Sequence, residues 1–391
     1  MEKTTRSIFG LSAAHFINDI YSPVLPAILP LLILQEGYSY FLAGVLVTAY
    51  NLTSSFTQPV IGWLFDRKNI RIPIAVSVLF SAFFMSFIGL VHNYTLLILF
   101  AMGGALGHAF FHPGALGLVS RMAKGANRAR LTSFFVIGGN MGFAVGPILA
   151  GLAVGYFGMN GLVILVIPAI LMVVSLNKII VPFSDQESGH GAETVETGVK
   201  KFPYVPVIML VTASAFRAWV IFATVAFMPT YLAEQGMSLV TANLLTSVML
   251  LAGVAGQVVG AGISDRYGKK KYVLLSICAA IPAFLLFLFT TGIMSLVALV
   301  AFGYLLWSSF SVTVAMSHEI APHWTGMVSG LMLGLAVGVG GVGVSVTGYF
   351  ADITSVQDSF ALLLIPMIIA LALFLLLPYR EDQIQEGRNE S

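Results

Sequence analysis

Two short runs place titratable side chains at helical spacing inside otherwise apolar segments. The first contains His15, Asn18 and Asp19 at positions i, i+3 and i+4, and the second contains His108 and His112 at positions i and i+4. Each run therefore puts its polar groups on one face of a helix. Imidazoles take up and release protons near neutral pH. We predict that Asp19 and the three histidines handle a proton, and that Asn18, Asp19 and His112 also contact a substrate.

Arg217 is a lone cation in a third apolar segment. A charge near the centre of a membrane costs at least about 2.5 kcal/mol, so such a residue is a functional candidate. A guanidinium can hold two oxygens of an anion, which predicts that Arg217 binds substrate. Desolvation favours the protonated form of Asp19, whereas an approaching Arg217 favours the carboxylate. The two residues could thereby couple protonation to conformation or to an anionic substrate.

Other interpretations of these residues remain open. Asp19 and Arg217 could simply neutralise each other, and each histidine could be a hydrogen-bonded packing residue. His15, Asp19, His108 and His112 are also a plausible set of metal ligands. Because no further carboxylate supports that site, we expect no metal and no cofactor. The sequence contains no Walker phosphate-binding motif and no nucleophile with an adjacent base, so we expect no enzyme activity.

The composition requires a lipid environment for the elements that hold these residues. Of the 391 residues, 58% are hydrophobic and 9% are charged, which leaves too little polar surface for a water-soluble chain. Spanning the hydrocarbon takes roughly 20 apolar residues in a helix. We predict twelve membrane-spanning helices, at residues 7–34, 41–64, 72–92, 95–118, 131–154, 159–182, 204–233, 240–263, 272–291, 295–318, 325–350 and 358–378.

The positive charges predict the orientation of these helices. If both termini are cytoplasmic, every Lys and Arg except Arg217 lies on the cytoplasmic side, as basic residues do in membrane proteins. We therefore expect a multi-pass protein of the inner (plasma) membrane with both termini in the cytoplasm. No basic tract stands apart from these loops, so we expect no nucleic-acid partner. We expect lipid, protons and a small-molecule substrate as partners, and a monomeric protein.

An internal repeat divides the chain into halves. A shift of 199 residues places Pro30 on Pro229, Gly37 on Gly236, Ser39 on Ser238, Gln58 on Gln257, and Asp66-Arg67 on Asp265-Arg266. Each half has an even number of spans, so the copies are parallel, as in transporters that rock about a central site. The predicted parts are a six-helix bundle at 1–183, a cytoplasmic linker at 184–203, a second bundle at 204–378 and a tail at 379–391.

The loop after the second predicted span resembles a signature of the major facilitator superfamily. Gly62, Asp66, Arg67 and Arg71 match its pattern G-x-L-x-D-R-x-G-R-[KR], although Asn69 and Ile70 depart from it, and Asp265-Arg266 is the repeat copy. The resemblance implies a fold of twelve helices in two pseudo-symmetric six-helix bundles. It also implies that Gly62, Asp66, Arg67, Arg71, Asp265 and Arg266 gate the cytoplasmic side. Glu319, at the end of a span, is either a second gating residue or a solvated acid.

Further motifs suggest a branch of that superfamily. Gly142, Gly146, Pro147 and Gly151 resemble the helix 5 signature of drug–proton antiporters. The motifs His15-x-x-Asn18-Asp19, Phe111-His112-Pro113, Gly138-Gly139-Asn140-x-Gly142 and Gly326-Met-Val-Ser-Gly-Leu331 together resemble the fosmidomycin-resistance branch. Arg217 also resembles a feature of that branch, a basic residue in helix 7. Since fosmidomycin is a small phosphonate, the resemblance implies a small anionic or polar drug-like cargo.

We therefore expect a secondary active transporter that exports such a compound in exchange for protons. The alternative within transport is proton symport or facilitated uptake of an organic acid or sugar. An alternative of another class is a histidine-dependent membrane metal protein or enzyme. The direction of substrate flux against an imposed pH gradient separates the first two, and metal analysis of purified protein tests the third.

Overall fold

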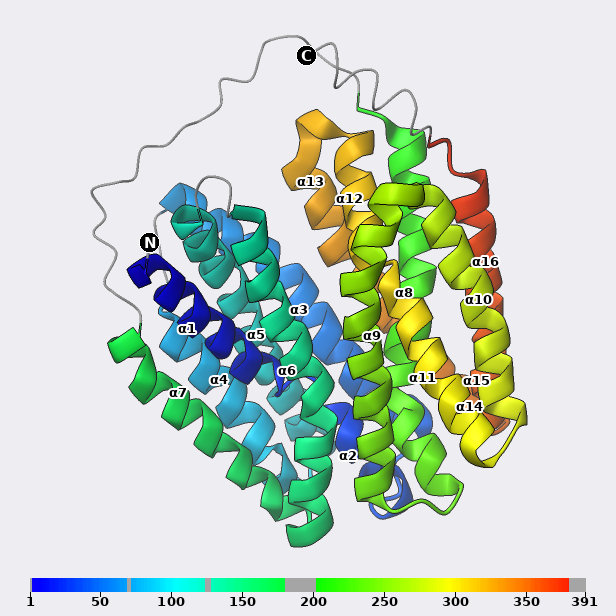
Figure 1. Ribbon diagram of the computed structural model, residues 1–391. Coiled ribbons are helices and arrows are strands. Elements are labelled where there is room, and N and C mark those ends of the chain that lie inside the picture. Colours follow the sequence, from blue (N-terminus) through cyan, green and yellow to red (C-terminus); the bar gives the residue numbers. More distant parts are fainter. Residues whose placement is uncertain (1, 69–71, 124–127, 180–201, 380–391) are drawn as a thin grey trace.

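The computed structural model describes residues 2–68, 72–123, 128–179 and 202–379, and within these ranges the fold is helical without strands. The helices form two six-span bundles that lie side by side (Figure 1). Nearly all of the predicted linker at 184–203, nearly all of the tail at 379–391, and Arg71 lie outside the described residues.

The first bundle contains the elements up to residue 179. Its helices are α1 Glu2–Asp19, α2 Val24–Leu34, α3 Tyr40–Lys68, α4 Ile74–Phe87 with the 3-10 turn η1 Ile88–Leu90, α5 Tyr94–Met122, α6 Arg128–Phe157, and the 3-10 helix η3 Met159–Leu165 with α7 Val166–Ile179.

The second bundle repeats this plan with more interruptions. Its helices are α8 Tyr204–Glu234, α9 Leu239–Tyr267, α10 Lys269–Phe289, α11 Gly292–Ser308 with α12 Phe310–Ile320, η5 Pro322–Trp324, α13 Thr325–Gly330, the π-helix η6 Leu331–Ala336, α14 Val337–Ile353, α15 Val356–Leu362 and α16 Leu364–Leu376.

All twelve predicted spans coincide with helical segments. Ten of the described segments are long and apolar enough to cross a membrane, and the segment 74–90 is apolar but shorter. The remaining one, α3, is 29 residues long. It carries polar residues such as Thr48 on the side that contacts the second bundle, where Thr48 Oγ1 donates to the carbonyl of Gly341 at 2.8 Å. The prediction of an all-helical membrane fold is confirmed.

The turns after the first span of each bundle confirm the repeat in atomic detail. Gly37 and Gly236 both have positive φ, 75° and 86°, a conformation that glycine adopts without strain. The hydroxyls of Ser39 and Ser238 then each accept a hydrogen bond from the backbone N–H three residues later, at 3.1 Å in both copies. Such a serine satisfies a free donor at a helix start. The 199-residue shift thus reproduces a complete turn and cap.

The first span departs from the repeat next to Asp19. Helix α1 ends at Asp19 and α2 begins at Val24 after Pro23, whereas α8 runs unbroken through Arg217. Proline has no N–H and disfavours helical geometry in the residue before it, which accounts for the break at Ser22-Pro23. The predicted proton-binding residue therefore lies at an interrupted helix end.

Glycines of α6 allow α1 to approach closely. A Cβ atom added at Gly138, Gly142 or Gly146 would press on the backbone of Ser12, Phe16 or Ile20 respectively. Gly151, further along α6, instead meets Asn243 of the second bundle, and Pro147 lies within the helix. The predicted close-packing role of these residues agrees with this arrangement.

We expect Gly142→Ala to destabilise the first bundle by about 1–3 kcal/mol, because overpacking forces backbone apart. An ideal Cβ there would lie 2.9 Å from the Cα of Phe16. The measurement is the Tm of the purified protein. The control is Gly330→Ala, where no described atom lies within 4 Å of the added Cβ. Equal Tm values for the two variants would contradict this packing role.

Candidate functional site

The first bundle brings three of the predicted proton-binding residues into contact. His15 and Asp19 come from the last turns of α1, and His112 comes from α5. The Nε2 atom of His15 lies 3.2 Å from Nε2 of His112 and 3.2 Å from Oδ2 of Asp19, and His112 Nε2 lies 3.7 Å from the same oxygen. His15 and Asp19 are only 6% and 7% exposed. We call His15, Asp19 and His112 the acceptor triad.

Backbone contacts determine the protonation of both imidazoles. His15 Nδ1 lies 2.9 Å from the carbonyl of Phe135, and His112 Nδ1 lies 2.9 Å from the carbonyl of His108. Because a carbonyl only accepts, both Nδ1 atoms must donate. In the neutral forms both Nε2 atoms are then acceptors that face a carboxylate oxygen. Three facing acceptors are stable only with a cation among them, and a proton on one Nε2 would make the triad neutral.

His108 joins the triad to the space between the bundles. Its Nδ1 lies 3.6 Å from Asp19 Oδ1 and 3.2 Å from the hydroxyl of Ser22, which lies 2.8 Å from the hydroxyl of Tyr50. Asn18, which is fully buried, donates from Nδ2 to Asp19 Oδ1 at 3.1 Å. A chain of polar groups therefore runs from Tyr50 to the buried carboxylate.

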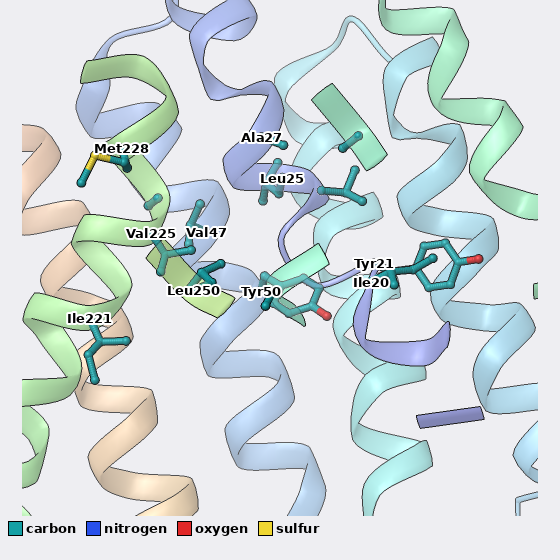
Figure 2. Close-up of a cluster of buried hydrophobic side chains, with 14 of the residues drawn as sticks. Ile20, Tyr21, Leu25, Ala27, Val47, Tyr50, Ile221, Val225, Met228 and Leu250 are labelled. Carbon is teal, nitrogen blue, oxygen red and sulfur yellow. The ribbon is translucent and has the colours of Figure 1, made fainter. Parts of the chain in front are cut away.

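Ser22 and Tyr50 line a small, partly open cavity. Its walls come from α3 and α6 of the first bundle, the α1–α2 break with α2, and α8 of the second bundle. Figure 2 shows four of the lining side chains, those of Leu25, Val47, Tyr50 and Val225. The other lining residues are Ser22, Pro26, Asn51, Phe143 and Phe222. The cavity lies between the two bundles and its lining includes no charged side chain.

Arg217 is buried inside the second bundle, 2% exposed, and does not line this cavity. Its two terminal nitrogens donate to Ser309 Oγ and Thr313 Oγ1, both at 2.9 Å, and its guanidinium lies over the rings of Phe310 and Phe374. Its Nε has no hydrogen-bond partner among the described residues.

Among the described residues, Arg217 therefore contacts no carboxylate, and Asp19 is not one of its partners. The two predicted partners each bind groups of their own bundle in this conformation. Direct neutralisation of Asp19 by Arg217 is therefore not what holds this conformation together. The positive charge of Arg217 stays uncompensated by any described acid.

The predicted gating residues lie at the end of the bundles that holds Arg121 and Lys269, which we call the basic end. Lys269 Nζ lies 3.4 Å from Asp265 and 3.2 Å from Glu319, all within the second bundle. Glu319 also accepts a hydrogen bond from the hydroxyl of Tyr379. Arg266 lies over the ring of Tyr267, and Gly62 has open space where a side chain would lie. Asp66 and Arg67 belong to α3, but their side chains lie outside the described residues.

Several contacts between the bundles lie at the opposite end, which we call the turn end because it holds the loops 35–39 and 235–238. Asp352 of α14 accepts hydrogen bonds from the backbone N–H groups of Tyr40 and Phe41 at 2.7 and 2.9 Å. The hydroxyl of Tyr40 donates to Glu234 of α8. A carboxylate of the second bundle therefore caps the first turn of α3 in the first bundle, where helices attract negative charge.

We expect Asp352→Asn to weaken closure of the turn end, because the amide loses the charge that these two N–H groups bind. Hydrogen bonds to a charged group contribute about 1.5–3 kcal/mol each, so the closed population should fall several-fold or more. Distances between spin labels placed on the two bundles measure that population. The control is Asp358→Asn, since Asp358 contacts Ser355 within one bundle. An unchanged distance distribution for Asp352→Asn would contradict the capping role.

Several of these contacts had no signal in the sequence. Ser309 and Thr313 follow no motif, and Asp352 is simply one of a few acids in the predicted outer loops. Tyr50 belongs to a polar stretch of α3, as does Asn51. The sequence does not show which helix of the other bundle packs against this stretch. Only the repeat points towards them, because it predicts two bundles with an interface.

Comparison with known proteins identifies a family and similar relatives. The model of the Major Facilitator Superfamily matches residues 9–344. The chain is 29% identical over 380 residues to the fosmidomycin resistance protein of Escherichia coli (strain K12), covering 95% of this chain and 93% of that protein. It is 28% identical to the uncharacterized MFS-type transporter YfnC of Bacillus subtilis (strain 168), covering 94% and 91%.

Among solved structures, the fold is similar to that of a bacterial homologue of the human lysosomal transporter Spinster in an inward-facing and unoccupied conformation. The TM-score is 0.77 at 17% identity, over 96% of this chain and 97% of that one. Identity this low bears on the fold alone. The resemblance inferred from the motifs is confirmed at the level of family and fold.

Proposed function

This chain belongs to the Major Facilitator Superfamily, and we propose that it is a proton-coupled antiporter that exports a small anionic or polar compound, such as a phosphonate antibiotic. The observation that carries the proton coupling is the acceptor triad. Both imidazoles already donate through Nδ1, so the triad needs a cation. Loss of a shared proton would leave a buried carboxylate facing two lone pairs, which destabilises this arrangement of α1 and α5.

The cargo is proposed from charge and similarity together. Arg217 is a buried cation that contacts no carboxylate among the described residues. We propose that its field favours an anion in the cavity between the bundles, since two lining residues, Phe222 and Val225, belong to the same helix. Asn18 and His112 contact Asp19 in the polar cluster that His108 and Ser22 join to the cavity, so all three are proposed to contact the cargo. A relative whose name records fosmidomycin resistance supports a phosphonate as the probe.

The orientation follows the charges. We place the basic end in the cytoplasm and the turn end outside, so this conformation, closed by Tyr40, Glu234 and Asp352 at the turn end, is inward-facing. That assignment is supported by the fold similarity to an inward-facing transporter. We propose an inner-membrane monomer with both termini cytoplasmic. The outward-facing state would close the basic end, where we propose that Gly62, Asp66, Arg67, Arg71, Asp265, Arg266 and Glu319 act as the gate.

The test is transport of fosmidomycin into inverted membrane vesicles with an imposed pH gradient. Inverted vesicles with an acidic interior should accumulate the compound, and dissipating the gradient should stop accumulation. Accumulation only under the opposite gradient would establish proton symport in the uptake direction instead. Downhill equilibration alone, unaffected by either gradient, would establish facilitated diffusion.

A second candidate function, a metal protein, is favoured by the spacing of the triad. A tetrahedral Zn²⁺ with Zn–N bonds of about 2.0–2.1 Å holds its ligand atoms roughly 3.3 Å apart, and His15, Asp19 and His112 offer one ligand atom each within 4.8 Å of one another. Elemental analysis of protein purified without chelators separates the two. Stoichiometric bound metal that disappears in His112→Gln and persists in His92→Gln would favour the metal protein.

A further inference from the structure

We infer that Asn51 selects the cargo by donating a hydrogen bond from its side-chain amide to an uncharged acceptor oxygen, such as a carbonyl. This inference deepens the proposed transport function, because it rests on the cavity between the bundles as the cargo site. It adds a requirement that the charge of Arg217 does not impose. In addition to any anionic group, the cargo carries an apolar body and a neutral hydrogen-bond acceptor.

The first observation is an unused donor. The Nδ2 atom of Asn51 is buried and has no hydrogen-bond partner among the described residues. Other described side-chain atoms share that state, but of their residues only Asn51 lines the cavity. A buried amide donor without a partner costs about 1–3 kcal/mol, so native proteins rarely leave one unless an ordered water or a ligand satisfies it.

The second observation is that the amide is held in place. Asn51 packs over Gly341 of α14, so that an ideal Cβ on this glycine would lie 2.7 Å from Asn51 Cβ and 3.1 Å from Nδ2. One turn earlier on α3, Thr48 Oγ1 donates to the Gly341 carbonyl at 2.8 Å. Asn51 therefore borders the cavity on the line where the two bundles meet, with its amide packed beside Gly341, a position that changes when the bundles move.

The third observation is that the neighbouring polar groups are already engaged. The hydroxyls of Ser22 and Tyr50 lie 2.8 Å apart, and Ser22 also contacts His108. The remaining lining residues are apolar and include the rings of Phe143 and Phe222. Since no lining side chain is charged, recognition within the cavity depends on one free amide and on apolar contact. This chemistry suits an aromatic or aliphatic body that carries one acceptor oxygen.

The test compares two soluble probes that differ only by the acceptor, 4-hydroxyacetophenone and 4-ethylphenol. Their apparent Kd values are measured from the concentration dependence of Tm for the wild-type protein, for Asn51→Leu, and for Asn160→Leu. Leu matches Asn in size but removes the donor. Asn160 is exposed and lies away from the cavity lining, so its replacement controls for the change of residue type.

We expect the wild type and Asn160→Leu to prefer the ketone by about fivefold, the ratio that one net hydrogen bond supplies. Asn51→Leu should bind the two probes equally and should keep or raise the Tm without ligand. An unchanged ketone preference in Asn51→Leu, or no preference in the wild type, would overturn the inference. Binding needs no pH gradient, so failed proton coupling and failed recognition by Asn51 give different results.

Discussion

Replacement of Asp19 by Asn is expected to reduce proton-driven export of fosmidomycin to below about a hundredth of the wild-type rate. The amide has nearly the shape of the acid, but it binds no proton and brings no charge to balance an imidazolium. The two Nε2 atoms of His15 and His112 would then face an amide that can donate to one of them. The triad would stay hydrogen-bonded in a single protonation state, and export would lose its link to the gradient.

The same variant should retain the fold and the cargo site. Exchange of labelled for unlabelled fosmidomycin across the membrane needs no net proton movement, so counterflow should persist when gradient-driven export is lost. Glu36→Gln is the matched control, because Glu36 is an exposed acid in the loop between α2 and α3. Gradient-driven export by Asp19→Asn at the wild-type rate would show that the proton binds elsewhere.

The second large effect is expected at Arg217. Arg217→Met should raise the KM for fosmidomycin roughly 30-fold, because the positive charge favours an anion in the cavity by about 2 kcal/mol without touching it. A neutral cargo of similar size should keep its KM. Transport in vesicles at several cargo concentrations measures both values. Arg130→Met is the control, since Arg130 is exposed near the start of α6 and belongs to none of the proposed sites.

Stability separates this role of Arg217 from a structural one. The residue is buried with two hydroxyl partners and no described acid, and such a charge costs folding energy that an apolar residue of similar volume would not. We therefore expect the Tm of Arg217→Met to equal or exceed that of the wild type. A large fall in Tm, with an equal loss of transport for neutral and anionic cargo, would show that Arg217 only stabilises the second bundle.

The fold was predictable because lipid and duplication restrict the alternatives. Apolar runs in a membrane form helices, and the 199-residue shift predicted turns that the structure reproduces at Gly37 and Gly236, down to the caps at Ser39 and Ser238. The triad was predictable in part, since i, i+4 spacing put His15 and Asp19 on one face. Its closure by His112 needed α1 and α5 to be placed together.

Other parts of the site depend on tertiary placement that spacing does not encode. The shift of 199 residues places Arg217 on Asn18, the neighbour of Asp19, and this alignment predicts that Arg217 and Asp19 share a cavity. The structure instead turns Arg217 towards Ser309 and Thr313 at the break between α11 and α12, because these hydroxyls accept from its terminal nitrogens. The direction of the side chain around α8 depends on its neighbours, which residue spacing alone does not give.

The most direct test of proton coupling at the triad is the number of protons released when purified protein binds fosmidomycin. A pH-sensitive dye in weakly buffered detergent solution, calibrated with added acid, reports this number. We expect about one proton per bound cargo molecule for the wild type and none for Asp19→Asn. Cargo binding by the wild type without proton release, or equal release by Asp19→Asn, would contradict proton coupling at the triad.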